Sequence, residues 1–298
     1  MKTAAEKRKQ FRKQMDSGKI MIAPSVYDAL SAKLAQAAGM NCLAMGGYAV
    51  EASRLGQPDV GLLSLYEMTA TLKNICDATD IPVVGDGDTG YGNALNVIRT
   101  VQEFEKAGAA SIFLEDQVWP KRCGHMEGKQ VISAEEHAQK IRAAYNARED
   151  KNFVIMARTD SRAIYGLDDA IERGKRYADA GAEMLFVEAL RTREEIEKVA
   201  RAFEGTGVHL VGNMIEGGKT PIVNAYELEQ MGFSLVFWAC APLYLVSKTL
   251  LNAFTVLKEK GDMESIRDQM IDFSKFNEFI GLDEYKKLEK EYKVDRDD

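Results

Sequence analysis

Short apolar runs alternate with longer amphipathic segments along most of this chain. Each run has three to five residues, many of them β-branched or aromatic, which is typical of buried strands. The predicted strands cover residues 20–23, 42–45, 81–84, 111–114, 153–157, 184–187, 209–211 and 235–238. The predicted helices cover residues 27–38, 65–78, 94–107, 134–147, 167–180, 194–203, 226–231 and 243–258. A lysine-rich polar segment, 4–15, predicts one more helix on the surface.

A helix stop followed by a short loop and a buried strand recurs along the chain. It occurs at Ala38-Gly39-Met40, Ala107-Gly108-Ala109 and Ala180-Gly181-Ala182, and more loosely at Met231-Gly232-Phe233. Eight such units in 298 residues favour an α/β fold of the (β/α)8 TIM-barrel type over an open doubly wound sheet. Because no linker-like stretch divides the chain, we expect a single barrel domain over residues 1–298. It would begin with the N-terminal helix and end in a charged helical tail, 263–298, that packs on a neighbouring subunit.

Composition narrows the function. A net charge of −7 disfavours binding to nucleic acid or to an anionic membrane. The N-terminus has no apolar signal segment, and the longest apolar run, 233–246, is short for a membrane span and contains Pro242. The four cysteines are scattered with no Cys-x-x-Cys pair, which argues against structural zinc and favours the reducing cytoplasm.

The C-terminal ends of the strands in a barrel converge on one face, and most of the predicted ends carry polar residues. The strongest signal is Asp86 and Asp88, which glycines flank on both sides. Alternate residues of an extended chain point the same way, so both carboxylates can face one site. Such oxygens suit Mg²⁺, and Glu115 on the next strand could hold a metal-bound water. The alternative is an Asx-turn cluster, because Asp-Gly pairs are common in turns.

A reactive loop follows the strand at 111–114. Lys121, Arg122, Cys123, Gly124 and His125 place a thiol among cations and an imidazole. Neighbouring cations are expected to lower a thiol's pKa, so Cys123 is a candidate proton donor or acceptor that Lys121 and His125 could orient. The alternative is an ordinary charged loop.

Arg158 and Asn213 follow two other predicted strands. An arginine at the barrel mouth suits bidentate binding of a substrate carboxylate, although it could instead form a salt bridge to Glu188 or Asp160. Asn213 could donate to a carboxylate or an enolate, or simply cap a loop. His137 and His209 have positions typical of structural residues.

Four motifs in this order resemble the isocitrate lyase/phosphoenolpyruvate mutase superfamily. They are Gly-Asp-Gly-Asp-Thr-Gly-Tyr-Gly at 85–92, Glu-Asp-Gln at 115–117, Lys-Arg-Cys-Gly-His at 121–125 and Ala-Arg-Thr-Asp at 157–160. The cysteine loop resembles the carbon–carbon lyase branch, which includes methylisocitrate lyase and 2,3-dimethylmalate lyase. The resemblance covers about residues 18–260. It implies a barrel with a swapped last helix, a homotetramer, bound Mg²⁺ (with Mn²⁺ as a substitute) and a mobile loop that carries the cysteine.

Residue roles follow from the same resemblance. It implies that Asp86 and Asp88 hold the metal, with Glu115 acting through water and Asp59 in an outer shell. The substrate would contact Met45, Gly46, Gly47, Tyr48, Gly124, Arg158, Glu188 and Asn213. Cys123 would be the general acid, assisted by Arg158, His125 and Lys121. The general base stays open, with Tyr48 as one candidate.

The implied reaction cleaves the C2–C3 bond of a 2-hydroxy dicarboxylate. In the methylisocitrate branch a serine usually stands at the position of Met45, and two further arginines bind the third carboxylate. Tyr244 and about Phe276 stand in their places here, while Trp238, Ala239 and Tyr244 suggest a more alkyl substrate. The best match is 2,3-dimethylmalate, cleaved to pyruvate and propionate. Cleavage of 2-methylisocitrate and hydrolysis of oxaloacetate are alternatives, and an inactive barrel that serves as a binding protein is the alternative from another class.

Overall fold

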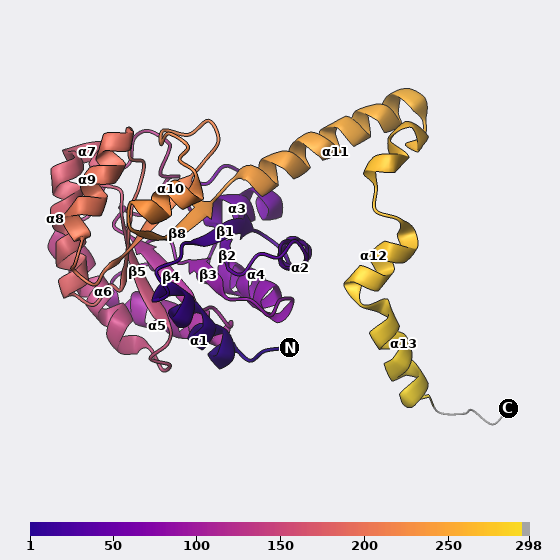
Figure 1. Ribbon diagram of the computed structural model, residues 1–298, viewed down its shortest axis with the longest axis horizontal. Helices are drawn as coiled ribbons and strands as arrows, with labels where there is room; N and C mark the ends of the chain where they lie inside the picture. Colours follow the sequence, from indigo (N-terminus) through magenta and orange to yellow (C-terminus); the bar gives the residue numbers. More distant parts are fainter. Residues whose placement is uncertain (294–298) are drawn as a thin grey trace. The chain divides into compact units, whose positions relative to one another are not determined.

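A closed barrel of eight parallel strands forms the centre of the protein in the computed structural model, which describes residues 1–293 (Figure 1). The strands pair in sequence order, and β8 closes the barrel against β1. Their bounds are β1 Met21–Val26, β2 Leu43–Met45, β3 Val83–Asp86, β4 Ser111–Glu115, β5 Val154–Thr159, β6 Met184–Val187, β7 His209–Met214 and β8 Phe233–Trp238. The predicted α/β barrel is therefore confirmed.

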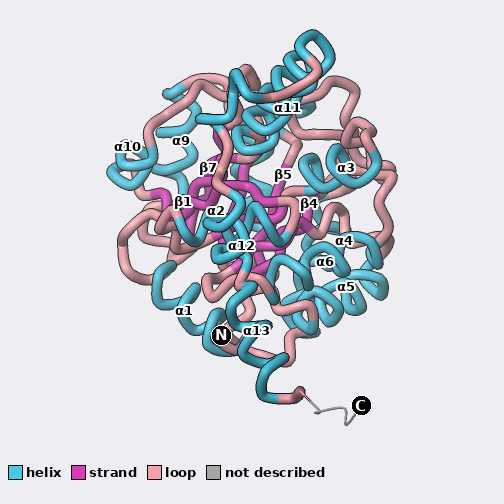
Figure 2. The backbone as a smooth tube through the Cα atoms, turned by 90° about the vertical axis from the view of Figure 1, so that its right-hand side faces the viewer, coloured by secondary structure: helices cyan, strands magenta, loops and turns pink. Residues whose placement is uncertain are grey.

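Helices alternate with the strands and surround them (Figure 2). They are α1 Ala4–Met15, α2 Ala29–Ala37, α3 Gly47–Leu55, α4 Leu65–Asp77, α5 Ala94–Lys106, α6 Ala134–Ala147, α7 Arg162–Tyr165, α8 Leu167–Asp179, α9 Arg193–Phe203 and α10 Ala225–Gln230. Helix α11, Ala241–Lys260, follows β8 in the chain. Serine, threonine, aspartate or asparagine side chains accept hydrogen bonds from the first turn of most of these helices, as at Ser64 before α4 and Ser133 before α6. The sequence therefore fixes the helix starts locally, without help from tertiary contacts.

Alternation along each strand creates two apolar layers. On β4, Ile112 and Leu114 point outward and pack with the helices, whereas Phe113 points into the barrel. The inner layer fills the barrel with large side chains such as Met156, Met184 and Phe186. The interior of the barrel is thus a packed core, and a site can form only at the C-terminal ends of the strands.

Helix α1 closes the N-terminal end of the barrel. Phe11 and Met15 are buried and belong to the inner layer, and Arg8 donates to the carbonyl of Ala109 just before β4. The prediction of a helix lying on the surface is therefore wrong for this face. Phe11 and Met15 are four residues apart and therefore share one side of a helix whose other residues are mostly polar.

Most predicted elements are confirmed to within about two residues, and three departures matter. Strand β1 continues through Pro24 to Val26 instead of ending at Pro24, because one proline removes one donor and leaves the pairing on either side intact. Helices α3 and α7 lie in segments for which the sequence predicted no helix. Helix α3 begins within the Gly46-Gly47 pair, where the sequence shows no helix signal.

The chain divides into two compact units, Met1–Leu243 and Tyr244–Asp298. The second unit holds most of α11, the 3₁₀ helix η1 (Glu264–Gln269), α12 (Phe273–Ile280) and α13 (Leu282–Glu291). The predicted helical tail over 263–298 is confirmed as far as residue 293, and its last five residues lie outside the described part. Among the described residues, no helix is long and apolar enough to cross a membrane.

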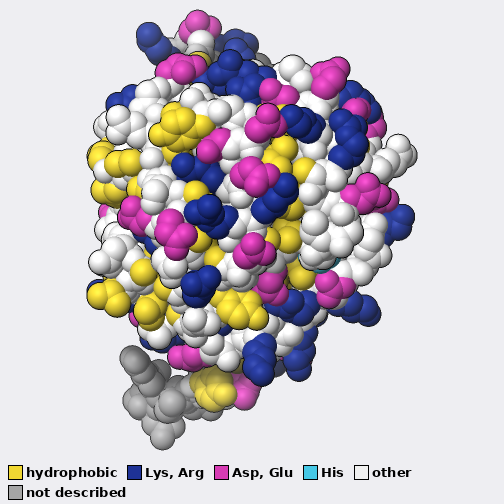
Figure 3. Space-filling view, turned by 90° about the vertical axis from the view of Figure 1, so that its left-hand side faces the viewer, with side chains coloured by type: hydrophobic (Ala, Val, Ile, Leu, Met, Phe, Trp, Pro, Cys, Tyr) yellow, Lys and Arg dark blue, Asp and Glu magenta, His cyan; other side chains and the backbone are white. Residues whose placement is uncertain are grey.

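Charges of both signs are mixed over the face of the molecule drawn in Figure 3. Lysine and arginine side chains lie beside aspartate and glutamate side chains, and no broad basic surface gathers on that face.

Candidate active site

The alternation that builds the inner core also builds the site above it. Asp86 lies two residues after Val84, whose side chain points into the barrel, so the side chain of Asp86 points the same way. Arg158 has the same relation to Met156, and Glu188 to Phe186. These inward positions at the C-terminal strand ends line a common cavity, together with Ser25, Gly46, Asn213 and Ala239. The sequence places polar residues where the barrel opens, so the fold converts a linear pattern into one site.

The cavity has a volume of about 60 Å³. Its floor consists of Phe113, Phe186 and Phe237, whose rings contact one another with centroids 5.7–6.0 Å apart. Ile215 and Ala239 add further apolar wall. The cavity is therefore small, since one water needs about 10–15 Å³ by the same kind of measure.

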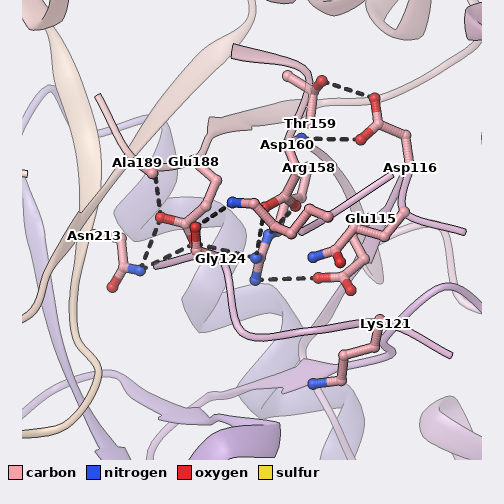
Figure 4. Close-up of polar contacts among 12 residues, drawn as sticks. Glu115, Asp116, Lys121, Gly124, Arg158, Thr159, Asp160, Glu188, Ala189 and Asn213 are labelled. Carbon is pink, nitrogen blue, oxygen red and sulfur yellow. Dashed lines mark hydrogen bonds and ion pairs between the residues drawn. The ribbon is translucent and has the colours of Figure 1, made fainter. Parts of the chain in front are cut away.

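Arg158 is the polar centre of the site (Figure 4). Its guanidinium lies 3.2 Å from Glu115, 2.9 Å from Asp160 and 3.3 Å from Glu188, and all four side chains are buried. The alternative of a salt bridge to Glu188 or Asp160 is therefore confirmed for both residues. Binding of a substrate carboxylate stays a prediction, and these partners fix where the guanidinium would present its remaining donors.

Glu188 is held in its ionised form. Burial alone would raise its pKa, but Arg158, His125 and Lys129 outweigh burial and lower the pKa to about 2. Asn213 donates to Glu188 at 3.2 Å, and its own Oδ1 atom has no hydrogen-bond partner among the described residues. One oxygen of Asn213 is thus available to a ligand in the cavity.

Asp86 and Asp88 converge by a different route from the one predicted. Asp86 Oδ1 accepts from the backbone N–H of Asp88 at 3.0 Å, so the Asx-turn alternative is realised. Asp88 lies beyond β3 with a positive φ of 47°, so the strand does not extend through it. Both carboxylates nevertheless meet beside Gly47, where an added Cβ would lie 3.0 Å from Asp86 and 3.4 Å from Asp88.

The ammonium of Lys121 lies in the same place. It contacts Asp59 and lies 2.9 Å from Asp88, and its pKa is raised well above the usual value because these carboxylates outweigh the effect of burial. The sequence placed Lys121 beside the thiol of Cys123. In the structure its charge instead balances two of the predicted metal-side carboxylates.

The residues present fit a divalent cation in charge and in ligand type. Six buried carboxyl groups (Asp59, Asp86, Asp88, Glu115, Asp160 and Glu188) accompany three buried cations (Lys121, Lys129 and Arg158), so the carboxyl groups outnumber the cations by three. Burial, followed by the charge of Asp88, raises the pKa of Asp86 to about 6, and burial raises that of Glu115 well above its usual range. In the described residues no three His, Cys, Asp or Glu side chains are already arranged as a ligand set, so the fit rests on charge and on hard oxygen donors.

The cysteine loop lies over the cavity, which both Cys123 and Gly124 line. The backbone N–H of Cys123 donates to the carbonyl of Asp59, and His125 Nε2 lies 3.1 Å from Glu188. His125 Nδ1 accepts from the backbone of Lys219, so Nε2 carries the proton and donates to Glu188. His125 therefore holds the loop and does not line the cavity itself.

Burial, followed by the charge of Asp59, raises the pKa of the Cys123 thiol to about 12. The expectation that neighbouring cations lower it is wrong, because Lys121 turns toward Asp59 and Asp88 and Arg122 bonds with the carbonyl of Glu127. The thiol is protonated at neutral pH, so of the two proposed roles the proton donor fits and the acceptor does not.

The predicted substrate contacts separate into two groups. Gly46, Gly47 and Tyr48 line the cavity, whereas Met45 is fully buried in the outer layer between strands and helices. Met45 therefore cannot touch a ligand in this cavity, because the residue before Gly46 points the other way. Likewise Trp238 packs with the outer layer, and Tyr244 belongs to the second unit.

Sequence reasoning missed three residues of the site. Ser25 lines the cavity, and its buried hydroxyl has no hydrogen-bond partner among the described residues; it continues the inward series Met21 and Ala23. Lys129 is buried against Asp160, and Asp116 anchors that segment by accepting from the backbone N–H of Asp160 at 2.9 Å. Lys129 gives no signal in the sequence, whereas extending the alternation on β1 would have found Ser25.

A family model for phosphoenolpyruvate phosphomutase matches residues 11–257. The chain is 42% identical to 2,3-dimethylmalate lyase of Eubacterium barkeri over 99% of this chain and 100% of the relative. It is 45% identical to a chloroplastic carboxyvinyl-carboxyphosphonate phosphorylmutase of Arabidopsis thaliana, covering 95% and 84%. It is 39% identical to a 2-methylisocitrate lyase of Aeropyrum pernix, covering 94% and 89%.

Solved structures agree with these relatives. A 2,3-dimethylmalate lyase superimposes with a TM-score of 0.90 at 34% identity, covering 98% of this chain and 96% of the other. An oxaloacetate acetylhydrolase with the inhibitor 3,3-difluorooxalacetate superimposes with a TM-score of 0.91 at 31% identity, covering 96% and 97%. A phosphonopyruvate hydrolase solved with oxalate and Mg²⁺ has a TM-score of 0.87 at 27% identity, covering 96% and 99%. This protein belongs to the phosphoenolpyruvate mutase/isocitrate lyase superfamily.

Proposed function

We propose that the protein is a Mg²⁺-dependent carbon–carbon lyase that cleaves 2,3-dimethylmalate to pyruvate and propionate. The observation that carries the proposal is the mixed lining of the cavity. Arg158 and buried carboxylates line it together with the rings of Phe113, Phe186 and Phe237, and the Arg158 guanidinium lies over the Phe186 ring, 5.2 Å from its centre. A dicarboxylate with methyl branches matches such a surface.

The small number of cations argues against a tricarboxylate. Among the described lining residues Arg158 is the one cation, and it already contacts three carboxylates. A third substrate carboxylate would be buried without a counter-charge, at a cost of several kcal/mol. The side chain of Met45 does not affect the binding of a third carboxylate, because it points away from the cavity.

In the proposed cleavage the residues of the site have the following roles. Arg158 binds a substrate carboxylate and stabilises the charge that develops as the C2–C3 bond breaks, and Asn213 assists through the second N–H of the amide that donates to Glu188. A base, for which Tyr48 is the candidate, takes the proton of the substrate hydroxyl. The thiol of Cys123 then donates a proton to the departing C3 carbanion, and the closed loop excludes water meanwhile. Mg²⁺, held by Asp86 and Asp88 with Glu115 and Asp59 in the outer shell, would supply Lewis acidity toward the substrate hydroxyl.

Hydrolysis of oxaloacetate is the second candidate, favoured by the equally close superposition of the oxaloacetate acetylhydrolase. A substrate panel with Mg²⁺ separates the candidates. Higher kcat/KM for 2,3-dimethylmalate than for 2-methylisocitrate and oxaloacetate supports the proposal. Oxalate plus acetate from oxaloacetate as the dominant reaction would replace it with the hydrolase, and inactivity on all substrates would favour a binding protein.

We also propose a homotetramer in the cytoplasm, with one catalytic domain per chain and a helical tail that meets another subunit. The second unit exposes large apolar side chains that water does not favour, including Leu251, Phe254, Phe273, Tyr285 and Leu288. The four free cysteines agree with a reducing compartment. Light scattering on the purified protein tests the tetramer, and a monomer at micromolar concentration would contradict it.

A further inference from the structure

Lys129 places a buried ammonium group between the cysteine loop and the barrel. It lies in the segment between β4 and α6, and its side chain is 2% exposed. Nζ donates to the carbonyl of Gly124 and lies 3.0 Å from Asp160 Oδ1. A buried ammonium is costly unless it is paired and hydrogen-bonded, so these two partners determine its position.

Each partner of Lys129 is next to a residue with a proposed role in catalysis, either along the chain or through hydrogen bonds. Gly124 follows Cys123 in the chain and lies directly on the barrel, since an added Cβ would come within 2.4 Å of Glu188 Cγ. Asp160 binds Arg158 through two hydrogen bonds of 2.9 and 3.2 Å. Lys129 therefore connects the backbone beside the thiol with the carboxylate that orients the guanidinium.

His125 also holds the loop, through its buried contact with Glu188, whereas the contacts of the other lysines with the loop are weaker candidates. Lys219 contacts Glu127 of the same loop, but the Glu127 side chain is 85% exposed, and exposed ion pairs contribute little. Lys121 pairs with Asp59 and Asp88 at the other end of the loop, away from Gly124. Lys129 alone among these lysines binds the backbone of the Cys-Gly-His segment.

We propose that Lys129 is a positioning residue that latches the loop in its closed state and couples closure to the orientation of Arg158. In the closed state the ammonium binds Gly124 and Asp160 together. When the loop opens, the Gly124 carbonyl leaves and the ammonium keeps only Asp160. The kinetic consequence rests on the proposed lyase function, whereas the latch itself does not.

Accessibility of Cys123 tests the latch without any assay of turnover. The rate of alkylation by iodoacetamide at Cys123 is measured by peptide mass spectrometry for wild type, Lys129→Met, Lys129→Gln and Lys129→Arg. Loss of a buried charged hydrogen bond should speed alkylation of Lys129→Met by about tenfold. Lys129→Gln, which keeps a donor without the charge, should lie between Met and wild type, and Lys129→Arg should restore most of the protection.

Lys219→Met is the matched control, because it removes an exposed ion pair from the same loop and should leave alkylation within about twofold of wild type. If Lys129→Met and Lys129→Gln fold normally by circular dichroism and alkylate at the wild-type rate, the latch is wrong. If only Lys129→Gln folds, its alkylation rate decides by the same criterion.

Turnover of 2,3-dimethylmalate provides the second readout. A latch predicts that Lys129→Met lowers kcat by about tenfold with a smaller change in KM, since the loop acts after binding. A lysine that merely neutralises Asp160 would lower thermal stability and leave both alkylation and kcat near wild type. Faster alkylation in a protein inactive on every substrate would retain the latch and reject the lyase.

Discussion

Gly124 lies so close to Arg158 that a Cβ on the glycine would come within 2.6 Å of the guanidinium Nη2 atom. The cysteine loop and the strand end of β5 therefore meet with no room for a side chain. Because Arg158 is itself fixed by three carboxylates, it cannot move aside to accommodate one. Closure of the loop over the cavity thus depends on a glycine at this position.

Gly124→Ala should prevent full closure. We expect kcat for 2,3-dimethylmalate to fall by about 100-fold, because a displacement of the catalytic group by about 1 Å has that effect. Steady-state kinetics measure the change. Lys219→Met, which removes an exposed ion pair from the same loop, is the control. Activity of Gly124→Ala within a few-fold of wild type would show that the loop does not close in this way.

Cys123→Ser should abolish most turnover while leaving the fold and Mg²⁺ binding intact. A serine hydroxyl is a far weaker acid than a thiol, and loss of a general acid costs about 10²–10⁴ in rate. Turnover is measured by pyruvate release, and Mg²⁺ binding by calorimetry. Unchanged turnover would remove Cys123 from the mechanism.

Removal of the divalent cation should abolish binding of a dicarboxylate. The buried carboxyl groups of the site outnumber its cations, so the site repels a dianion alone. Calorimetric titration with oxalate should give heat with Mg²⁺ and none in a chelator, and Asp86→Asn should weaken binding with Mg²⁺ by at least about tenfold. Equal binding of oxalate in the chelator would contradict the metal assignment.

The barrel was predictable because local signals repeat. Glycine stops such as Gly108 and Gly181 precede buried strands, and the polar strand ends show where the site lies. Asp86, Arg158 and Glu188 follow from this reasoning, since each ends a strand of plain alternation.

The features that were predicted wrongly or missed from the sequence depend on tertiary contacts. The burial of α1 requires an open barrel end that only the folded chain provides. The side chain of Met45 points outward because of its register, which one residue decides. Lys129 takes its role from Gly124 and Asp160, the latter 31 residues away, and no local pattern indicates that contact.

Acid should destabilise the protein partly through His137 on α6. Burial, followed by the charge of Lys140, lowers the pKa of His137 to about 3, so the folded state keeps the imidazole neutral. The unfolded chain takes up a proton near the ordinary value of 6.5, so stability is lost as the pH falls from 6.5 toward 3. At pH 5 the titration of His137 lowers the free energy of unfolding by about 2 kcal/mol.

Urea unfolding at pH 7 and pH 5 measures this effect. The rings of His137 and Tyr177 pack with their centroids 4.6 Å apart. His137→Phe keeps a ring in this position and removes the titrating group. The variant should lose about 2 kcal/mol less than wild type between the two pH values. An equal loss in both proteins would show that His137 does not contribute.

The central claim is that the thiol of Cys123 delivers a proton to carbon as the C2–C3 bond breaks. The most direct measurement is NMR of 2,3-dimethylmalate incubated with the protein and Mg²⁺ in D₂O. Wild type should give pyruvate and an equal amount of propionate that carries one deuterium at C2, whereas Cys123→Ser should give neither product at a comparable rate. Absence of pyruvate with wild type, or the same labelled propionate at an undiminished rate with Cys123→Ser, would contradict it.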